Sequence, residues 1–206
     1  MVGIDVERLF RAQGQISVLR ALWKAPTPLT GRQIQQLAGV HNRTTMQCLE
    51  DLEDLGLLRR RTVGRAYLYS LKRPNRVVRD LIDPIFRAEQ AAPERFVREL
   101  GKVLKGQCLS AVLYGSVARG RAGPASDVDL LVVVKDAAAG ERFAGRTQTK
   151  AEQLVQKGWS LMLEANVKTA GELAKQWNSR LMKQIRKDGQ LVAGRPLEEV
   201  RRGGRS

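Results

Sequence analysis

The stretch GSVARGRAGPASDVDLLVVV, residues 115–134, decides the fold of the second half of the chain. It follows an apolar run at residues 109–114 and ends in another at residues 130–134. Short runs rich in valine and leucine are typical of buried strands, and the glycines and proline between them favour a turn. We therefore predict two strands joined by a polar, glycine-containing turn.

Two carboxylates open the second of these strands. Side chains alternate between the faces of a strand, so Asp127 and Asp129 should project to the same side. Carboxylates held close together repel each other unless a cation lies between them, and oxygen ligands suit Mg²⁺ or Mn²⁺. The pair predicts a divalent-metal site. The plainer alternative is a turn at Ser126-Asp127 that enters a buried strand, with Asp129 paired to an arginine.

The turn before the strand carries groups that suit a phosphate. Gly115 allows the backbone to approach a ligand closely, and Ser116 adds a hydroxyl donor. Arg119 and Arg121 can neutralise phosphate charge. These residues predict a nucleotide site beside the metal.

The segment GSVARGRAGPASDVD resembles the signature of nucleotidyltransferases of the DNA polymerase β superfamily: Gly-Ser, a spacer, then Asp-x-Asp. GSVARG before SDVDLLV is also similar to the minimal nucleotidyltransferases of bacteria and archaea, and the resemblance covers roughly residues 106–195. It implies transfer of a nucleoside monophosphate from an NTP to a hydroxyl, with Asp127 and Asp129 as catalytic residues that hold the metal ions.

Active members of this superfamily usually carry a third carboxylate on a neighbouring strand. Here the next strand is predicted at residues 159–167, where Glu164 is the only acidic residue and lies toward the end. Glu164 is either a displaced metal ligand or a surface residue. The sequence therefore leaves catalytic activity uncertain.

The first third of the chain predicts three helices and a hairpin. Thr30 is a suitable N-cap for the second helix, with Ile34 and Leu37 facing inward, and Gly39 supplies a tight turn. The third helix is expected from His41-Asn42 to Leu55. Strands at residues 57–62 and 66–71 would form the hairpin.

Residues 39–71, GVHNRTTMQCLEDLEDLGLLRRRTVGRAYLYSL, resemble winged-helix regulators of the ArsR and MarR kind. The resemblance implies that the third helix enters the major groove of double-stranded DNA and that the hairpin contacts the backbone or the minor groove. The alternative is a solvated face or a protein-binding surface. The acidic residues at 50–54 must then face away from DNA. The predicted DNA contacts are Asn42, Arg43, Thr44 and Gln47 in the helix and Arg59, Arg60, Arg61 and Arg65 in the hairpin.

The composition points to a polyanionic partner. The 206 residues include 36 Lys and Arg against 21 Asp and Glu, a net charge of +15, which favours nucleic acid over a membrane surface. A generally basic proteome is the plainer explanation. Two cysteines argue against a disulfide scaffold and for a reducing cytoplasm. Neither a leader peptide nor a spanning apolar stretch is apparent, so we expect a cytoplasmic protein without membrane contact.

The expected fold class is α+β with two domains. Residues 1–74 form a winged helix-turn-helix and residues 75–105 a helical linker that Pro84 and Pro93 kink or divide. Residues 106–206 form a polymerase β-like nucleotidyltransferase α/β domain with a mixed sheet, a closing helix over residues 171–187 and a mobile tail from residue 201.

Three functions fit these expectations. The first is a DNA-binding transcriptional regulator, a homodimer, whose second domain binds Mg²⁺ and an NTP. The second is an active nucleotidyltransferase that modifies a protein or RNA hydroxyl. The third is a pseudoenzyme scaffold that pairs with a protein partner.

Overall fold

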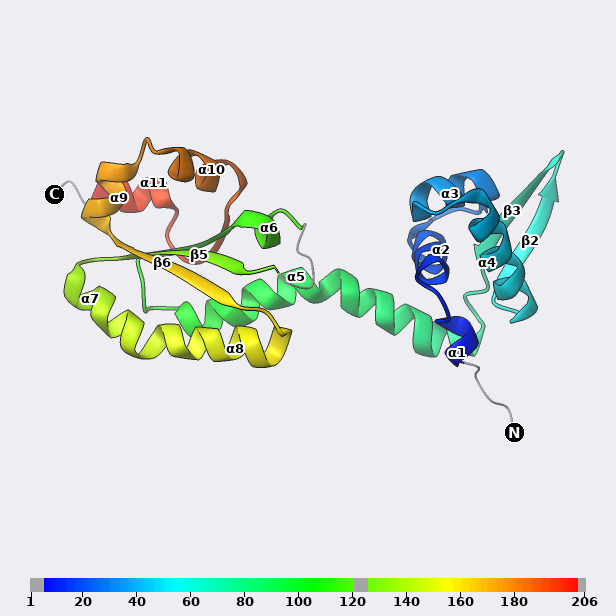
Figure 1. The fold of residues 1–206 in the computed structure, drawn as a ribbon, viewed down its shortest axis with the longest axis horizontal. Helices are drawn as coiled ribbons and strands as arrows, with labels where there is room; N and C mark the ends of the chain where they lie inside the picture. Colours follow the sequence, from blue (N-terminus) through cyan, green and yellow to red (C-terminus); the bar gives the residue numbers. More distant parts are fainter. Residues whose placement is uncertain (1–5, 121–125, 204–206) are drawn as a thin grey trace. The chain divides into compact units, whose positions relative to one another are not determined.

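A computed structural model describes residues 6–120 and 126–203 of the chain (Figure 1). Contacts within it divide the chain into two compact units, Met1–Ala91 and Ala92–Ser206. Within the described ranges, every helix is too short or too polar to cross a membrane.

The N-terminal unit combines helices with a small antiparallel sheet. The sheet has the order β1-β3-β2, and the β2–β3 hairpin lies where the sequence predicts it. Its core joins Leu19 of α2, Ile34 of α3, Leu52 of α4 and Leu58 of β2, all at most 2% exposed. The elements are α1 (Val6–Leu9), α2 (Gln13–Lys24), β1 (Leu29–Thr30), α3 (Gly31–Ala38), α4 (Asn42–Asp54), β2 (Leu58–Val63) and β3 (Ala66–Leu71).

Local interactions define both ends of α3. The Thr30 hydroxyl accepts from the Gln33 amide, and the Gln33 side chain in turn accepts from the Thr30 amide. This capping box confirms Thr30 as the N-cap. Gly39 ends the helix at φ 65°, a left-handed conformation that glycine adopts without strain. The turn leads into α4, whose N-cap is His41.

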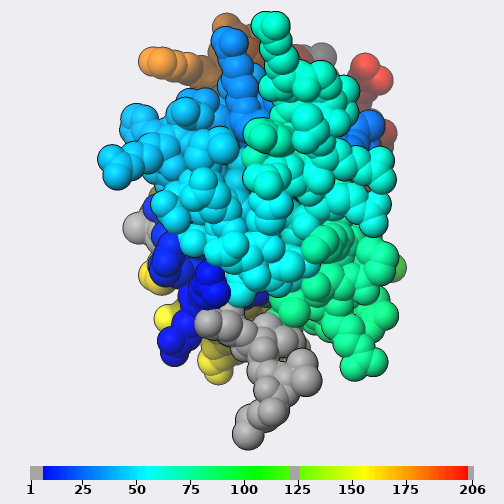
Figure 2. All heavy atoms as spheres, turned by 90° about the vertical axis from the view of Figure 1, so that its right-hand side faces the viewer, coloured from blue at the N-terminus to red at the C-terminus, as the bar shows by residue number. Residues whose placement is uncertain are grey.

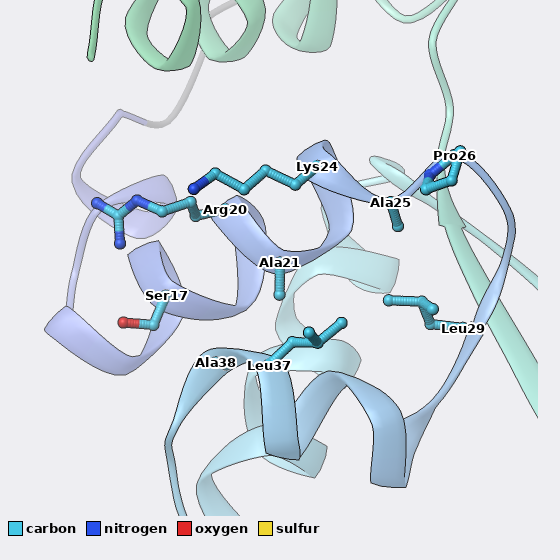
Figure 3. A pocket seen from close by; sticks show the side chains of 9 residues that line it. All are labelled: Ser17, Arg20, Ala21, Lys24, Ala25, Pro26, Leu29, Leu37 and Ala38. Atoms are coloured by element: carbon cyan, nitrogen blue, oxygen red, sulfur yellow. The ribbon is translucent and has the colours of Figure 1, made fainter. Parts of the chain in front are cut away.

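The prediction that Leu37 faces inward is wrong, because its side chain is 65% exposed. The buried stripe of α3 continues from Ile34 to Ala38, four residues later, and leaves Leu37 outside it. Leu37 instead lines a groove of about 460 Å³ between α2 and α3, opposite Ala21 and Leu29 (Figure 3).

The long helix that follows contributes to both units. A π-helical turn, η1 (Val78–Ile82), leads into α5 (Asp83–Leu104). The Asp83 amide donates to the Val78 carbonyl of η1, so α5 continues directly from that turn, and Pro84 and Pro93 both lie inside the helical stretch. Phe86 belongs to the core of the N-terminal unit, whereas Phe96 belongs to that of the C-terminal unit. The boundaries at 74/75 and 105/106 stay predictions.

The C-terminal unit contains a mixed four-stranded sheet, as predicted, with the order β6-β5-β4-β7. Strands β5 and β6 are parallel, and the other pairs are antiparallel. The strands are β4 (Ser110–Tyr114), β5 (Val128–Val134), β6 (Leu163–Thr169) and β7 (Gln190–Gly194). The helical segments are α6 (Gly115–Ala118), α7 (Ala137–Arg142), η2 (Phe143–Gln148), α8 (Thr149–Trp159), α9 (Ala170–Gln176), α10 (Arg180–Asp188) and α11 (Leu197–Gly203).

Helices cover both faces of this sheet (Figure 1). Leu130 and Val132 pack on the side of α5, η2 and α8, and Leu131 and Val133 on the side of α9, α10 and α11. A strand buried on both faces has no polar alternation, which explains the continuous apolar run of β5. Asp129 lies on the same face as Leu131, because side chains two residues apart point the same way.

Three expectations for this unit are wrong. The strand predicted at residues 159–167 is β6, Leu163–Thr169, because α8 extends to Trp159. The helix predicted at residues 171–187 is two helices, since Ser179 caps the start of α10. Residues 201–203 belong to α11 rather than to a mobile tail, and the Arg201 guanidinium stacks 4.7 Å from the ring of Trp177. The sequence did not foresee β7 as a strand.

Candidate functional site

The turn after β4 brings the backbone against a carboxylate. Gly115 begins α6 with φ 76°, in the region that favours glycine. A Cβ at this position would overlap Oδ2 of Asp129. Two independent reasons, backbone conformation and space, therefore require glycine at residue 115.

Asp127 and Asp129 flank a residue that faces the opposite way. Strand β5 begins at Val128, which is fully buried, so Asp127 precedes the strand and is exposed, while Asp129 is half-buried. The negative charge of Asp127 raises the pKa of Asp129, which means that the two carboxylates are close enough to repel each other.

Glu164 lies beside Asp129 on the neighbouring strand. The parallel pairing of β5 and β6 puts these two residues in register, and the Val128 amide donates to the Met162 carbonyl at 2.7 Å at the start of both strands. Because β6 begins at Leu163, Glu164 is near the beginning of the strand rather than toward its end as expected. A third carboxylate therefore adjoins the pair found in the sequence.

The charges in this cluster are poorly balanced. Burial raises the pKa of Asp129, Glu164 and Asp127 raise it further, and among the described residues Arg119 lowers it. Tyr114 of β4, which pairs with Asp129 of β5, has its pKa raised by burial and by Asp129 and Glu164. Clustered negative charge of this kind marks candidate functional sites.

Two polar residues near this site, Tyr114 and Asn166, were not predicted from the sequence. Burial raises the pKa of Tyr114, and the Asn166 side chain of β6 lowers it, so Asn166 is close to the phenol. The position of Tyr114 directly before Gly115 could have indicated its place at the site. No feature of the sequence indicated Asn166, because its position beside the site depends on the register of β6.

The donor set fits a hard divalent cation, because carboxylates supply only oxygen and Mg²⁺ prefers oxygen. Within residues 6–120 and 126–203, no three His, Cys, Asp or Glu side chains converge closely enough to hold a metal by themselves. Mg²⁺ commonly takes part of its coordination from phosphate and water. The cluster is therefore suited to a metal that arrives with a phosphate ligand.

The predicted phosphate-binding residues are near the cluster as far as the structure describes them. Ser116 lies in α6, directly after Gly115, and is half-buried. Arg119 follows α6, is exposed, and is close enough to Asp129 to lower its pKa. Arg121 lies outside the described residues.

In the N-terminal unit, α4 exposes the side chains expected to contact DNA. Figure 2 looks onto this unit, with α3 and α4 light blue and the hairpin cyan. Thr45, Cys48 and Leu49 are buried against the core, which orients the helix. The exposed predicted contacts on α4 are Asn42, Arg43, Thr44 and Gln47.

Acidic residues of α4 are paired with arginines of the same unit. The Asp51 carboxylate accepts a hydrogen bond from the Arg11 guanidinium, and Oδ2 of Asp54 lies 3.7 Å from a guanidinium nitrogen of Arg8. Oε2 of Glu53 lies 3.3 Å from a guanidinium nitrogen of Arg60. These pairs reduce the repulsion that the acidic run would exert on a polyanion.

The arginines of the hairpin differ in their surroundings. The Arg60 guanidinium also stacks 5.0 Å from the ring of Tyr67, so it is held on the hairpin. Arg59, Arg61 and Arg65 are exposed, and within the described part of the chain they have no ion-pair partner. These three are the hairpin charges most available to a ligand.

Comparison with known proteins concerns the C-terminal unit. Residues 94–191 match the family model described as a nucleotidyltransferase domain. This range runs from α5 into β7 and includes the Gly115 turn, both aspartates and Glu164. A comparison with curated proteins found no match. The match supports a nucleotidyltransferase-like activity for this part of the chain.

Proposed function

We propose that the C-terminal unit transfers a nucleoside monophosphate from an NTP to an acceptor hydroxyl. The observation that carries this proposal is the register of Glu164 with Asp129, which supplies a third carboxylate beside the Gly115 turn. Without that carboxylate, the aspartate pair alone would favour binding without chemistry.

Each residue has a role in this proposal. Asp127, Asp129 and Glu164 offer oxygen ligands, and bound Mg²⁺ or Mn²⁺ would supply charge neutralisation at the reacting phosphate. The Ser116 hydroxyl and the Arg119 guanidinium bind phosphate oxygens. The acceptor oxygen bonds to the α-phosphorus as the bond to the bridging oxygen breaks and pyrophosphate leaves. The acceptor proton passes to a free oxygen of Glu164, which is exposed.

Label transfer tests the proposal. The purified protein is incubated with each α-labelled NTP, Mg²⁺ or Mn²⁺, and cell extract, and labelled protein and RNA are separated. We expect Glu164→Gln and Asp129→Asn each to reduce transfer by about 100-fold or more, the equivalent of about 2.7 kcal/mol in the barrier. Glu199→Gln on α11 is the control, because it removes an exposed carboxylate elsewhere in the same unit.

Two results would reject this function. One is the absence of label in every fraction with all four nucleotides. The other is a Glu164→Gln variant as active as the wild type. Metal-dependent NTP binding without transfer would instead favour the alternative, a regulator or a pseudoenzyme scaffold that senses the nucleotide or pairs with a protein partner.

We further propose that the N-terminal unit is a winged helix that binds double-stranded DNA and makes the chain a transcriptional regulator. The specific observation is the exposure of the polar face of α4 together with that of Arg59, Arg61 and Arg65, which have no ion-pair partner among the described residues. Asn and Gln side chains can bond to adenine and Arg to guanine, whereas hairpin arginines suit phosphates.

Fluorescence anisotropy with labelled duplex DNA tests the second proposal. The triple variant Arg59→Ala/Arg61→Ala/Arg65→Ala should bind more weakly and with a smaller dependence of affinity on salt. The control Lys150→Ala/Lys157→Ala/Lys175→Ala removes the same charge from exposed positions of the C-terminal unit. Equal affinity of the hairpin variant and the wild type would reject DNA binding by this face.

A further inference from the structure

A cavity of about 650 Å³ lies in the C-terminal unit, away from the carboxylate cluster. It is bounded by residues 106–109 before β4, by the end of β5, and by α7 and η2. Its volume is within the range of small-molecule sites.

The cavity and the carboxylates lie at opposite ends of the same pair of strands. Ser110 pairs with Val133 beside the cavity, and Tyr114 pairs with Asp129 at the other end. Four residue steps along β4 correspond to about 14 Å at about 3.4 Å per residue. A ligand in the cavity would therefore not reach Asp129.

Positive charge gathers at this cavity. Lys135, Arg142 and Arg146 line it and are exposed, and no carboxylate of residues 6–120 or 126–203 lines it. In the described part of the chain none of these three has an ion-pair partner. The acidic residues next to them in the sequence are Asp136 and Glu141, and neither lines the cavity. Asp136 accepts from the Ala139 amide at 2.9 Å and caps α7. Three positive charges around one cavity make its electrostatic potential more positive and favour the binding of an anion.

A hydrogen bond connects two of the segments around the cavity, and part of the lining is apolar. The Thr147 hydroxyl donates to the Gln107 side chain at 3.4 Å and joins η2 to the segment before β4. Leu109, Val134, Ala139 and Phe143 supply apolar lining. Burial raises the pKa of the Cys108 thiol to about 11, so this group is neutral near pH 7 and adds no negative charge.

The two arginines are placed for joint binding. Arg142 and Arg146 are four residues apart, a spacing that brings helical side chains to the same face. The π-helical turn of η2 begins between them, at Phe143, and such turns are common at functional sites. Guanidinium groups bind phosphate oxygens in pairs of parallel hydrogen bonds.

We propose that this cavity binds a small phosphate-bearing ligand of the nucleoside diphosphate class, at a site separate from the carboxylates. Lys135, Arg142 and Arg146 hold the phosphates, and the apolar part of the lining accommodates the ring. Because no carboxylate lines the cavity, binding here needs no divalent metal. Binding at the carboxylate cluster does need one, since the metal must offset the repulsion between carboxylates and phosphates.

Calorimetry in EDTA separates the two sites. ADP is titrated into the full-length protein at low salt, and pyrophosphate is titrated in parallel. We expect one ADP site in EDTA that Arg142→Gln/Arg146→Gln weakens at least about tenfold, about 1.4 kcal/mol. Asp129→Asn should leave ADP binding in EDTA unchanged, which makes the result independent of the proposed transferase function.

A charge-removal control on α8 and a second cavity variant accompany the double arginine variant. Lys150→Gln/Lys157→Gln removes two exposed charges from α8 outside the cavity and should bind ADP as the wild type does. Lys135→Gln tests the same site should the double arginine variant not fold. The absence of ADP binding in EDTA, an equal loss in the α8 control, or a loss in Asp129→Asn would each overturn the proposal. Equal affinities for ADP and pyrophosphate would overturn the assignment to a nucleotide.

Discussion

Asp129 is the residue around which the C-terminal site is arranged. The Gly115 backbone lies against its carboxylate, and Tyr114 and Glu164 are its partners on the two neighbouring strands. One side chain thus contributes to the conformation of the turn, to the charge of the cluster and to the proposed metal ligation. Substitutions at Gly115 and Asp129 separate these contributions.

Gly115→Ala should destabilise the protein and abolish nucleotide transfer. An alanine in the left-handed region costs about 1–2 kcal/mol, and its Cβ would additionally displace Asp129. Gly120→Ala is the matched control, because Gly120 also has a positive φ, 65°, and an added Cβ would meet no atom of the described residues within 4 Å, apart from its chain neighbours. Urea unfolding should show a larger loss at residue 115 than at residue 120. Equal losses would contradict the close approach to Asp129.

Asp129→Asn should raise the melting temperature at pH 7 in EDTA. The pKa of Asp129 is raised in the folded protein, so the folded state binds its proton more tightly than the unfolded state does. The resulting stability is present below the ordinary aspartate pKa and is lost as the pH rises through the raised pKa. The difference between variant and wild type should therefore shrink as the pH falls toward 4. Scanning calorimetry between pH 4 and pH 7 measures the melting temperatures of variant and wild type. A lower melting temperature for the variant at pH 7 would contradict repulsion between Asp129 and its neighbouring carboxylates.

At the scale of elements, strand alternation distinguishes the arginines of the hairpin. Arg60 lies opposite Tyr69, which is buried, whereas Arg61 lies opposite Leu68 and, like Arg59, points to the other face of β2. The sequence predicts DNA contacts from both Arg60 and Arg61. Of these two arginines, Arg60 forms an ion pair with Glu53, and Arg61 forms none with the residues that the structure describes.

Arg61→Ala should weaken DNA binding more than Arg60→Ala. Loss of one phosphate contact lowers the slope of log affinity against log salt by about 1. Arg60 is already neutralised in part by Glu53, so its removal should change the slope less. Anisotropy titrations at several salt concentrations measure both slopes. A larger change for Arg60→Ala would show that its ion pair opens when DNA binds.

At the scale of the whole molecule, the two proposed activities belong to units with separate cores. The core that supports α4 and the hairpin is built around α2, α3 and the start of α5, and the core beneath β5 uses the end of α5. No residue of the carboxylate cluster belongs to the N-terminal unit. The two proposed functions should therefore respond to different substitutions.

Arg43→Ala should change sequence preference in DNA binding, by about 1–3 kcal/mol at the affected base, without changing metal-dependent NTP binding. Asp127→Asn should do the reverse. Anisotropy with operator variants and calorimetry with NTP and Mg²⁺ measure the two properties on the same preparations. A variant that loses both while keeping its melting temperature would contradict separate functions.

We also expect a homodimer, because winged-helix regulators read two half-sites of a duplex. Light scattering over a range of protein concentrations measures the mass of the particle in solution. A monomer at the highest concentration, together with one protein per short duplex, would contradict this expectation.

Local periodicity and turn chemistry determined much of the fold. Thr30 and Gly39 indicated the ends of α3, and the apolar runs on either side of the Gly115 turn indicated β4 and β5. These features depend on neighbours in the sequence, through backbone conformation and side-chain alternation. Alternation within a strand predicted that Asp127 and Asp129 share a side, but Asp127 precedes β5, so that prediction applies to Asp129 alone and their shared side stays a prediction.

Only the tertiary structure decided which distant residues lie beside the Gly115 turn, β4 and β5. Helix α8 extends to Trp159, so β6 begins later than predicted, at Leu163. In the parallel pairing of β5 with β6, Glu164 is then in register with Asp129, although the two residues are far apart in the sequence. The packing of Trp177 between Arg186 and Arg201, 4.5 and 4.7 Å from its ring, likewise joins separate helices. Strand register and helix packing are set by which surfaces exclude water together, and residues distant along the chain contribute to that choice.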